Sequence, residues 1–157
     1  MAQANMSAIA GSEVEMIDLR KNYDLEEIND FFTRIKKEGR QIHRYATGVT
    51  DMLFPFFYGI LFILINAFLL KNITNHKSSW IYLSLIPILL MLVDFRENFN
   101  TLKLLDAFPN MTEVQVHSAS TVTGIKSLLT SLSLTLTLVL GIIWLIKWGL
   151  KYTTKRQ

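Results

Sequence analysis

Two carboxylates and an asparagine end an apolar stretch at a point where a membrane-spanning helix would still be in progress. In the sequence MLVDFRENFN at 91–100, Asp94, Glu97 and Asn98 stand at positions i, i+3 and i+4, and Thr101 follows at i+7. On a helix this spacing puts all four side chains on one face. An acid is costly to expose to lipid, so we expect this face to turn towards protein. Such a group can pair with cations, or bind a proton, a small ion or a lipid headgroup.

Charged residues at the ends of two other apolar stretches are expected to join this face. Asp51 stands where the first stretch begins, and Lys126 stands where the third begins. If three helices cross a membrane in turn, the start of the first, the end of the second and the start of the third lie on one side. The sequence therefore predicts one polar cluster at that boundary. Its candidate members are Asp51, Asp94, Glu97, Asn98, Lys126, Arg40, Arg44 and Tyr58.

Several other kinds of chemistry do not fit these residues. The chain has no cysteine, which excludes disulfides, thiolate zinc sites and cysteine nucleophiles. Its three histidines form no metal-binding box, and it has neither a P-loop nor a G-x-S-x-G motif. The carboxylates would suit Mg²⁺ or Ca²⁺ best, but they can pair as readily with Arg40, Arg44 and Lys126. We therefore expect no metal and no cofactor.

The elements that must position the cluster are membrane spans. Residues 52–70 and 128–146 are each nineteen residues without a formal charge, long enough to cross a hydrocarbon core of about 30 Å. The apolar run at 80–93 is too short to cross alone, which predicts a helix that continues through Asp94 to about Leu105. The prediction is an all-α integral membrane helical bundle. Its three transmembrane helices are expected at about 50–70, 80–105 and 124–147, with a loop at 109–122.

The N-terminal part is expected to hold one amphipathic helix. Asp24 is suited to cap it, and Glu27 stands at the capping-box position three residues later. Apolar residues then recur at helical spacing, which predicts a helix at about 24–38 on the bilayer or on the bundle, ending in a bend at Gly39. Residues 1–22 are expected to be a flexible tail, and 23–157 a single membrane domain. The apolar positions of the helix are Leu25, Ile28, Phe32 and Ile35.

The same residues carry a resemblance to a known family. The segments GRQIH at 39–43, DMLFPFFY at 51–58 and DFREN at 94–98, with Pro109 and Lys126, resemble a widespread, functionally uncharacterised family of small bacterial-type polytopic membrane proteins. The resemblance covers about residues 17–130 and implies the same architecture, without implying a reaction. The chain differs from the family pattern at His43, where the family has an aromatic residue. Family members also have a hydrophobic helix before the motifs, and we expect no such helix in residues 1–22.

Charge and composition limit the function classes. The net charge of +3 is ordinary for a membrane protein with basic flanks, and no basic stripe alternates with aromatic residues, so nucleic acid is not an expected partner. Ten Lys and Arg residues fall on the N-terminal side of the spans against six on the other, which favours an N-terminus inside, in a cell inner or plasma membrane. The resemblance implies the alternative, because the helix that precedes the motifs in the family would place the same surface outside.

Two functional hypotheses follow. The first is a membrane scaffold or complex subunit without enzymatic activity, whose charged cluster fixes the bundle or a partner subunit. The alternative is a membrane-embedded enzyme or carrier that binds a lipid headgroup or small ion at the cluster. The expected partners are the lipid bilayer, a lipid headgroup and other membrane protein subunits.

Overall fold

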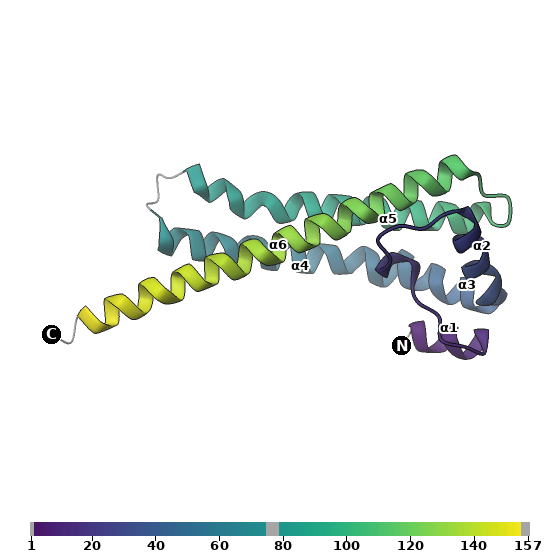
Figure 1. The fold of residues 1–157 in the computed structure, drawn as a ribbon, viewed down its shortest axis with the longest axis horizontal. Helices are drawn as coiled ribbons and strands as arrows, with labels where there is room; N and C mark the ends of the chain where they lie inside the picture. Colours follow the sequence, from purple (N-terminus) through teal and green to yellow (C-terminus); the bar gives the residue numbers. More distant parts are fainter. Residues whose placement is uncertain (1, 75–78, 155–157) are drawn as a thin grey trace. The chain divides into compact units, whose positions relative to one another are not determined.

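The structure is a computed structural model, and it describes residues 2–74 and 79–154, with Asp18 and residues 152–154 described by their backbone alone. Every regular element in this part of the chain is a helix, so the all-α prediction is confirmed (Figure 1). In chain order the elements are α1 (Ala2–Ala10), η1 (Ile17–Leu19), α2 (Leu25–Arg34), α3 (Lys36–Tyr45), η2 (Ala46–Thr50), α4 (Asp51–Ile73), η3 (Ser79–Leu85), α5 (Ile86–Ala107) and α6 (Glu113–Thr154).

Three helical stretches are long and apolar enough to cross a membrane. They are Lys36–Ile73, Ser79–Ala107 and Glu113–Lys151. The second continues through Asp94 without a break, as the length of its apolar run predicts. Each stretch is longer than the predicted span that it contains, because each extends well beyond its apolar part into polar sequence.

The contacts divide the chain into two compact units, where the sequence analysis expected a single domain at 23–157. Unit 1 consists of Met1–Pro55 and Leu92–Ser127, and unit 2 of Phe56–Met91 and Leu128–Gln157. Unit 1 holds α1, α2, α3 and all eight residues proposed for the cluster except Tyr58. Unit 2 holds most of the uncharged apolar sequence of the three long helices.

Unit 1 includes residues that were expected to form a flexible tail. Within 1–22, α1 lies against α3, and η1 follows it (Figure 1). The side chains of Met6, Val14 and Ile17 are at most 3% exposed and belong to the main apolar core, together with Ile28 and Phe32. The sequence does not show this burial, because isolated apolar residues in a polar segment form no periodic pattern that would predict a helix. In the structure each of them nevertheless buries a full side chain.

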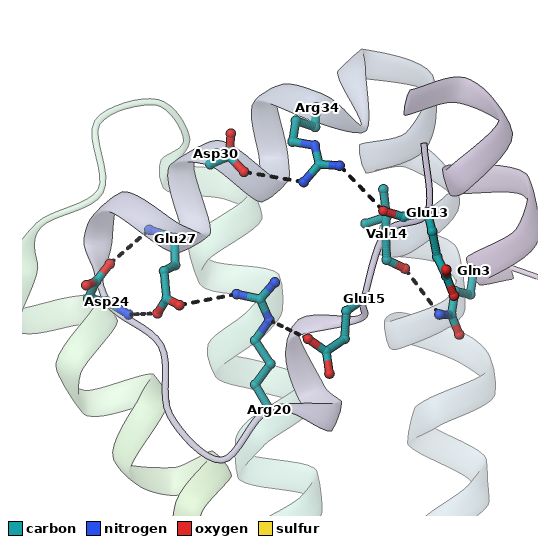
Figure 2. A network of polar contacts seen from close by, with 9 residues as sticks. All are labelled: Gln3, Glu13, Val14, Glu15, Arg20, Asp24, Glu27, Asp30 and Arg34. Atoms are coloured by element: carbon teal, nitrogen blue, oxygen red, sulfur yellow. Dashed lines mark hydrogen bonds and ion pairs between the residues drawn. The ribbon is translucent and has the colours of Figure 1, made fainter. Parts of the chain in front are cut away.

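Polar contacts fix the path of this N-terminal segment (Figure 2). The side-chain amide of Gln3 donates to the carbonyl of Val14 at 3.1 Å. Arg20 forms ion pairs with Glu15 at 3.3 Å and with Glu27 of α2 at 3.5 Å. These contacts join residues that are far apart in the segment, so the chain from 2 to 24 follows one course over unit 1.

Helix α2 matches the predicted amphipathic helix closely at its start and face. The Asp24 side chain accepts from the backbone N–H of Glu27, and the Glu27 side chain accepts from the backbone N–H of Asp24, which confirms the capping box. Its apolar face is buried as predicted, with Ile28, Phe32 and Ile35 at 0% exposure.

The end of this helix differs from the prediction. The helix stops at Arg34, and the direction of the chain changes at Lys36, whose φ of +57° is unusual for a residue with a side chain. Gly39 lies inside α3 and makes no bend. A Cβ atom at Gly39 would meet the Cβ of Ile35 at 2.7 Å and the Cγ of Met6 at 3.6 Å, so the glycine permits close packing here.

Helix α6 begins about eleven residues earlier than predicted, so the expected loop at 109–122 is wrong from Glu113 onwards. Its start is a second capping box. The backbone N–H of Thr112 donates to the Gln115 side chain at 2.9 Å, and the backbone N–H of Gln115 donates to the Thr112 hydroxyl at 3.3 Å. The T-x-x-Q sequence carries this signal, and it predicts a helix start in the same way as Asp24 and Glu27 do.

Unit 2 contains η3, a 3₁₀-helix, which makes the second membrane-competent stretch longer than an α-helix of the same number of residues. A 3₁₀-helix rises about 2.0 Å per residue, against about 1.5 Å in an α-helix. The stretch from Ser79 to Val93 therefore covers about 26 Å, where a purely α-helical segment would cover about 22 Å. Pro87 stands in the first turn of α5, directly after the end of η3.

The close approach at Gly39 generates a prediction about stability. Gly39→Ala should lower the free energy of unfolding by about 1 to 3 kcal/mol, because the new methyl group overlaps Ile35. Gly141→Ala is the matched control, since a Cβ at this position in α6 meets nothing within 4 Å. The control should leave stability unchanged or slightly higher, because alanine favours helix. Chemical unfolding in detergent measures both, and equal effects of the two variants would contradict the packing role of Gly39.

Candidate functional site

Lys126 of α6 forms ion pairs with two carboxylates of α5, all within unit 1. Its Nζ atom lies 3.7 Å from Oδ1 of Asp94 and also pairs with Oε2 of Glu97. The Glu97 side chain is 2% exposed, against 14% for Asp94 and 18% for Lys126. We call these three residues the triad. Its deepest member is an acid that reaches almost no solvent and has a cation directly beside it.

The spacing of residues along α5 explains why these groups meet. Glu97, Asn98 and Thr101 are at most 5% exposed, and Leu104 continues the same face into the apolar core. Arg96, between the two acids, is exposed, as its position on the helix predicts. The predicted inward face of α5 is therefore present in the structure.

Asn98 connects this face to the first membrane-competent stretch. Its Nδ2 donates to the main-chain carbonyl of Asp51 at 2.7 Å. In a regular helix the N–H of the residue four positions later would donate to this carbonyl, but that residue is Pro55, which has no N–H. The chain just before is also irregular, because η2 is a π-helical turn in which the Asp51 N–H donates to the Ala46 carbonyl. Asn98 thus supplies the hydrogen bond that Pro55 removes.

Two predicted cations lie elsewhere in unit 1. Arg40 donates to the carbonyl of Phe32 at 2.7 Å, and its guanidinium carbon lies 4.6 Å from the centre of the Phe108 ring. Arg44 pairs with Asp106 near the end of α5. Neither makes an ion pair with Asp94 or Glu97 in the part of the chain described, so among the predicted counter-charges Lys126 is the one that contacts these acids. Both arginines are about two turns or more before Asp51, and nearer partners satisfy them.

The last predicted member, Tyr58, belongs to unit 2. Its ring centre lies 6.3 Å from that of Phe62, one turn later in α4, in an edge-to-face arrangement. Grouping Tyr58 with Arg40 and Arg44 requires one regular helix from 40 to 58, and the π-helical turn at 46–50 interrupts that regularity.

Sequence reasoning missed two polar features. Thr123, one turn before Lys126 on α6, is 1% exposed and lies beside Glu97. In unit 2, Asn66 is fully buried, and its Oδ1 accepts from the Thr137 hydroxyl at 2.9 Å. An asparagine alone in an uncharged run of nineteen residues was a readable signal, because a polar group among lipid tails usually has a partner on another helix.

The residues that carry the family resemblance are largely the residues that make these contacts. Gly39 packs on Ile35, and Pro55 leaves a carbonyl to which Asn98 donates. Comparison with protein-family models, with curated proteins and with solved structures finds no match for this chain. The site is therefore interpreted from its own geometry.

That geometry suits a cross-link between helices better than a reaction centre. One cation shared by two acids binds α5 to α6, and an amide binds α5 to the backbone at the start of α4. No group of three or more His, Cys, Asp or Glu side chains able to hold a metal occurs among the described residues.

The geometry of the triad predicts that losing the charge of Lys126 costs more stability than losing the charge of Asp94. Lys126→Leu should lower the free energy of unfolding by about 3 to 5 kcal/mol, because it leaves the buried Glu97 carboxylate without its cation. Asp94→Asn keeps the shape of the side chain and removes one of two competing acids, so its cost should stay below about 1 kcal/mol. Thermal and chemical unfolding of both variants test this, and an Asp94→Asn variant as unstable as Lys126→Leu would contradict it.

The link between Asn98 and Pro55 predicts an energetic coupling. Asn98→Ala should cost about 1 to 3 kcal/mol, since it removes a buried hydrogen bond to the Asp51 carbonyl. In a Pro55→Ala background the restored N–H can donate to that carbonyl, so Asn98→Ala should then cost at least about 1 kcal/mol less. Asn100→Ala is the control, because Nδ2 of Asn100 makes no hydrogen bond. If the free-energy costs of the Pro55 and Asn98 substitutions simply add, Asn98 does not supply the hydrogen bond that Pro55 removes.

Proposed function

We propose that this protein is a small polytopic membrane protein that acts as a scaffold or as a subunit of a larger membrane assembly, without enzymatic activity. The observation that carries the proposal is the ion pairing of Lys126 with both Asp94 and Glu97. A reaction centre needs a group poised to attack, transfer a proton or bind substrate, and such a group is usually held partly accessible in a cleft. Here the charged groups contact one another and the most central of them is 2% exposed.

The remaining candidate groups support the same proposal. Arg40 and Arg44 are engaged within unit 1, and the amide of Asn98 is used to complete the hydrogen bonding of a helix. Polar contacts of this type favour one packing of the helices over others, because a misplaced helix would leave a charge or a carbonyl unpaired in a medium of low polarity. A fixed packing of the helices within unit 1 is what a scaffold offers to its partners. Membership of the family that the motifs resemble is part of this proposal.

One observation favours the alternative of a carrier or enzyme that handles a small ion or a lipid headgroup. The triad has two carboxylates and one ammonium, so its net charge is −1 when all three groups are ionised. A proton, a monovalent cation or the ammonium group of a headgroup could balance that charge at Asp94, which is the more accessible acid.

Native mass spectrometry of the full chain, released from detergent, separates the two functions. The scaffold proposal predicts that the wild type retains another polypeptide, or further copies of itself, in fixed stoichiometry. The alternative predicts a single chain of 18.1 kDa with a small bound species that disappears in both Asp94→Asn and Lys126→Leu.

Arg44→Gln is the charge-changing control for both variants, since its ion pair with Asp106 lies outside the triad. A single chain with nothing bound, or with a bound species that depends on the triad, would overturn the scaffold proposal.

A further inference from the structure

The face of α5 opposite the triad presents two cations and an aromatic ring to the outside. In unit 1 this face consists of Leu92, Arg96, Phe99 and Lys103, spaced i, i+4, i+7 and i+11 along the helix. All four side chains are exposed, Leu92 by 55% and Phe99 by 56%. An exposed leucine followed by alternating cationic and aromatic residues is a pattern typical of helices that leave a bilayer.

The two cations of this face have no ion-pair partner within the described residues. The acids of α5 are already engaged, Asp94 and Glu97 with Lys126 and Asp106 with Arg44. The outward face therefore carries two unbalanced positive charges. The other arginines of unit 1 each contact an acid, a carbonyl or a ring, and these are Arg20, Arg34, Arg40 and Arg44.

The position of Arg96 along the helix fits the level of lipid headgroups in a membrane whose apolar core ends near Leu92. Leu92 stands at the end of the apolar run, and the headgroup layer of each leaflet is about 5 to 8 Å thick. Arg96 and Phe99 follow Leu92 by about 6 and 10 Å along the helix axis. Side chains of an α-helix tilt towards its N-terminus, which here is the apolar end, so the long stem of Lys103 extends back towards the same layer.

We propose that Arg96, Phe99 and Lys103 form a binding surface for the phosphate group of an anionic phospholipid in the leaflet next to unit 1. The guanidinium of Arg96 can contact two phosphate oxygens at once, and the ammonium of Lys103 adds a second positive charge. The exposed ring of Phe99 stands between these two cations along the helix. The inference rests on the membrane insertion proposed above, but it does not depend on the scaffold role.

Competition between two lipids tests the proposal. The full chain is placed in nanodiscs with equal amounts of phosphatidylglycerol and phosphatidylcholine of the same acyl chains, and native mass spectrometry counts the lipids that it retains. The wild type should prefer phosphatidylglycerol. In Arg96→Gln/Lys103→Gln the preference should fall by up to about 30-fold, since each cation contributes about fivefold near an anionic surface.

Two further variants keep the test specific. Lys36→Gln/Lys37→Gln removes the same charge from exposed positions in α3 and should retain the preference. Arg96→Lys/Lys103→Arg keeps both charges and should retain it as well. A wild type that does not discriminate, or a Lys36→Gln/Lys37→Gln variant that loses as much as the outward-face variant, would overturn the proposal. Either result would leave the scaffold proposal untouched, because that proposal is tested by bound polypeptide.

Discussion

The pairing of one cation with two acids, of which Glu97 is buried, is the interaction on which unit 1 depends most. Burying Glu97 without a counter-charge would cost several kcal/mol, far more than any single apolar contact in the unit can offset. With Lys126 beside it, the same acid binds α5 to α6. The helices must then keep one rotation about their axes, because turning α5 by one residue would replace Glu97 at the contact by Arg96 or Asn98. Little of the membrane-competent helices is buried, so this constraint is what favours one packing of α5 on α6 over others.

Irregular backbone serves the same purpose at the start of α4. Pro55 removes the usual helical donor to the Asp51 carbonyl, just after the π-helical turn at 46–50. An irregular helix in an apolar medium is tolerated where other groups complete its hydrogen bonds. Asn98 does so, one residue after the buried acid of the triad. Two consecutive residues of α5 thus bind two different partners. The contacts that fix unit 1 are therefore concentrated in a short segment of one helix, and the opposite side of that segment is exposed.

Much of this arrangement could be read from local patterns in the sequence. Long uncharged runs predict helices of membrane length, since only a helix satisfies its backbone within one segment, and the spacing of Asp94, Glu97, Asn98 and Thr101 gives the buried face of α5. The capping box at Asp24 predicts the start of α2 to the residue. The same signal at Thr112 was overlooked, although it marks the start of α6 as clearly.

The features that could not be read depend on contacts between distant segments. The burial of Met6 and Ile17 follows from their packing on helices that lie far along the chain, and no periodic pattern announces it. Arg40 and Arg44 could have reached the acids on a regular helix, but nearer partners at Phe32, Phe108 and Asp106 take them. The sequence predicts a bend at Gly39, whereas in the structure Gly39 lies inside a helix and allows close packing on Ile35. A glycine is compatible with either, because it has no side chain.

An exchange of charges between positions 97 and 126 tests the central claim most directly. Each single reversal, Glu97→Lys or Lys126→Glu, leaves like charges together at a largely buried site and should unfold the protein at a much lower temperature. The double variant restores an opposite pair between α5 and α6. The account predicts that it regains at least about 2 kcal/mol over the sum of the two single effects, measured by chemical unfolding in detergent. A double variant that is as unstable as this sum would show that the triad does not hold the two helices together.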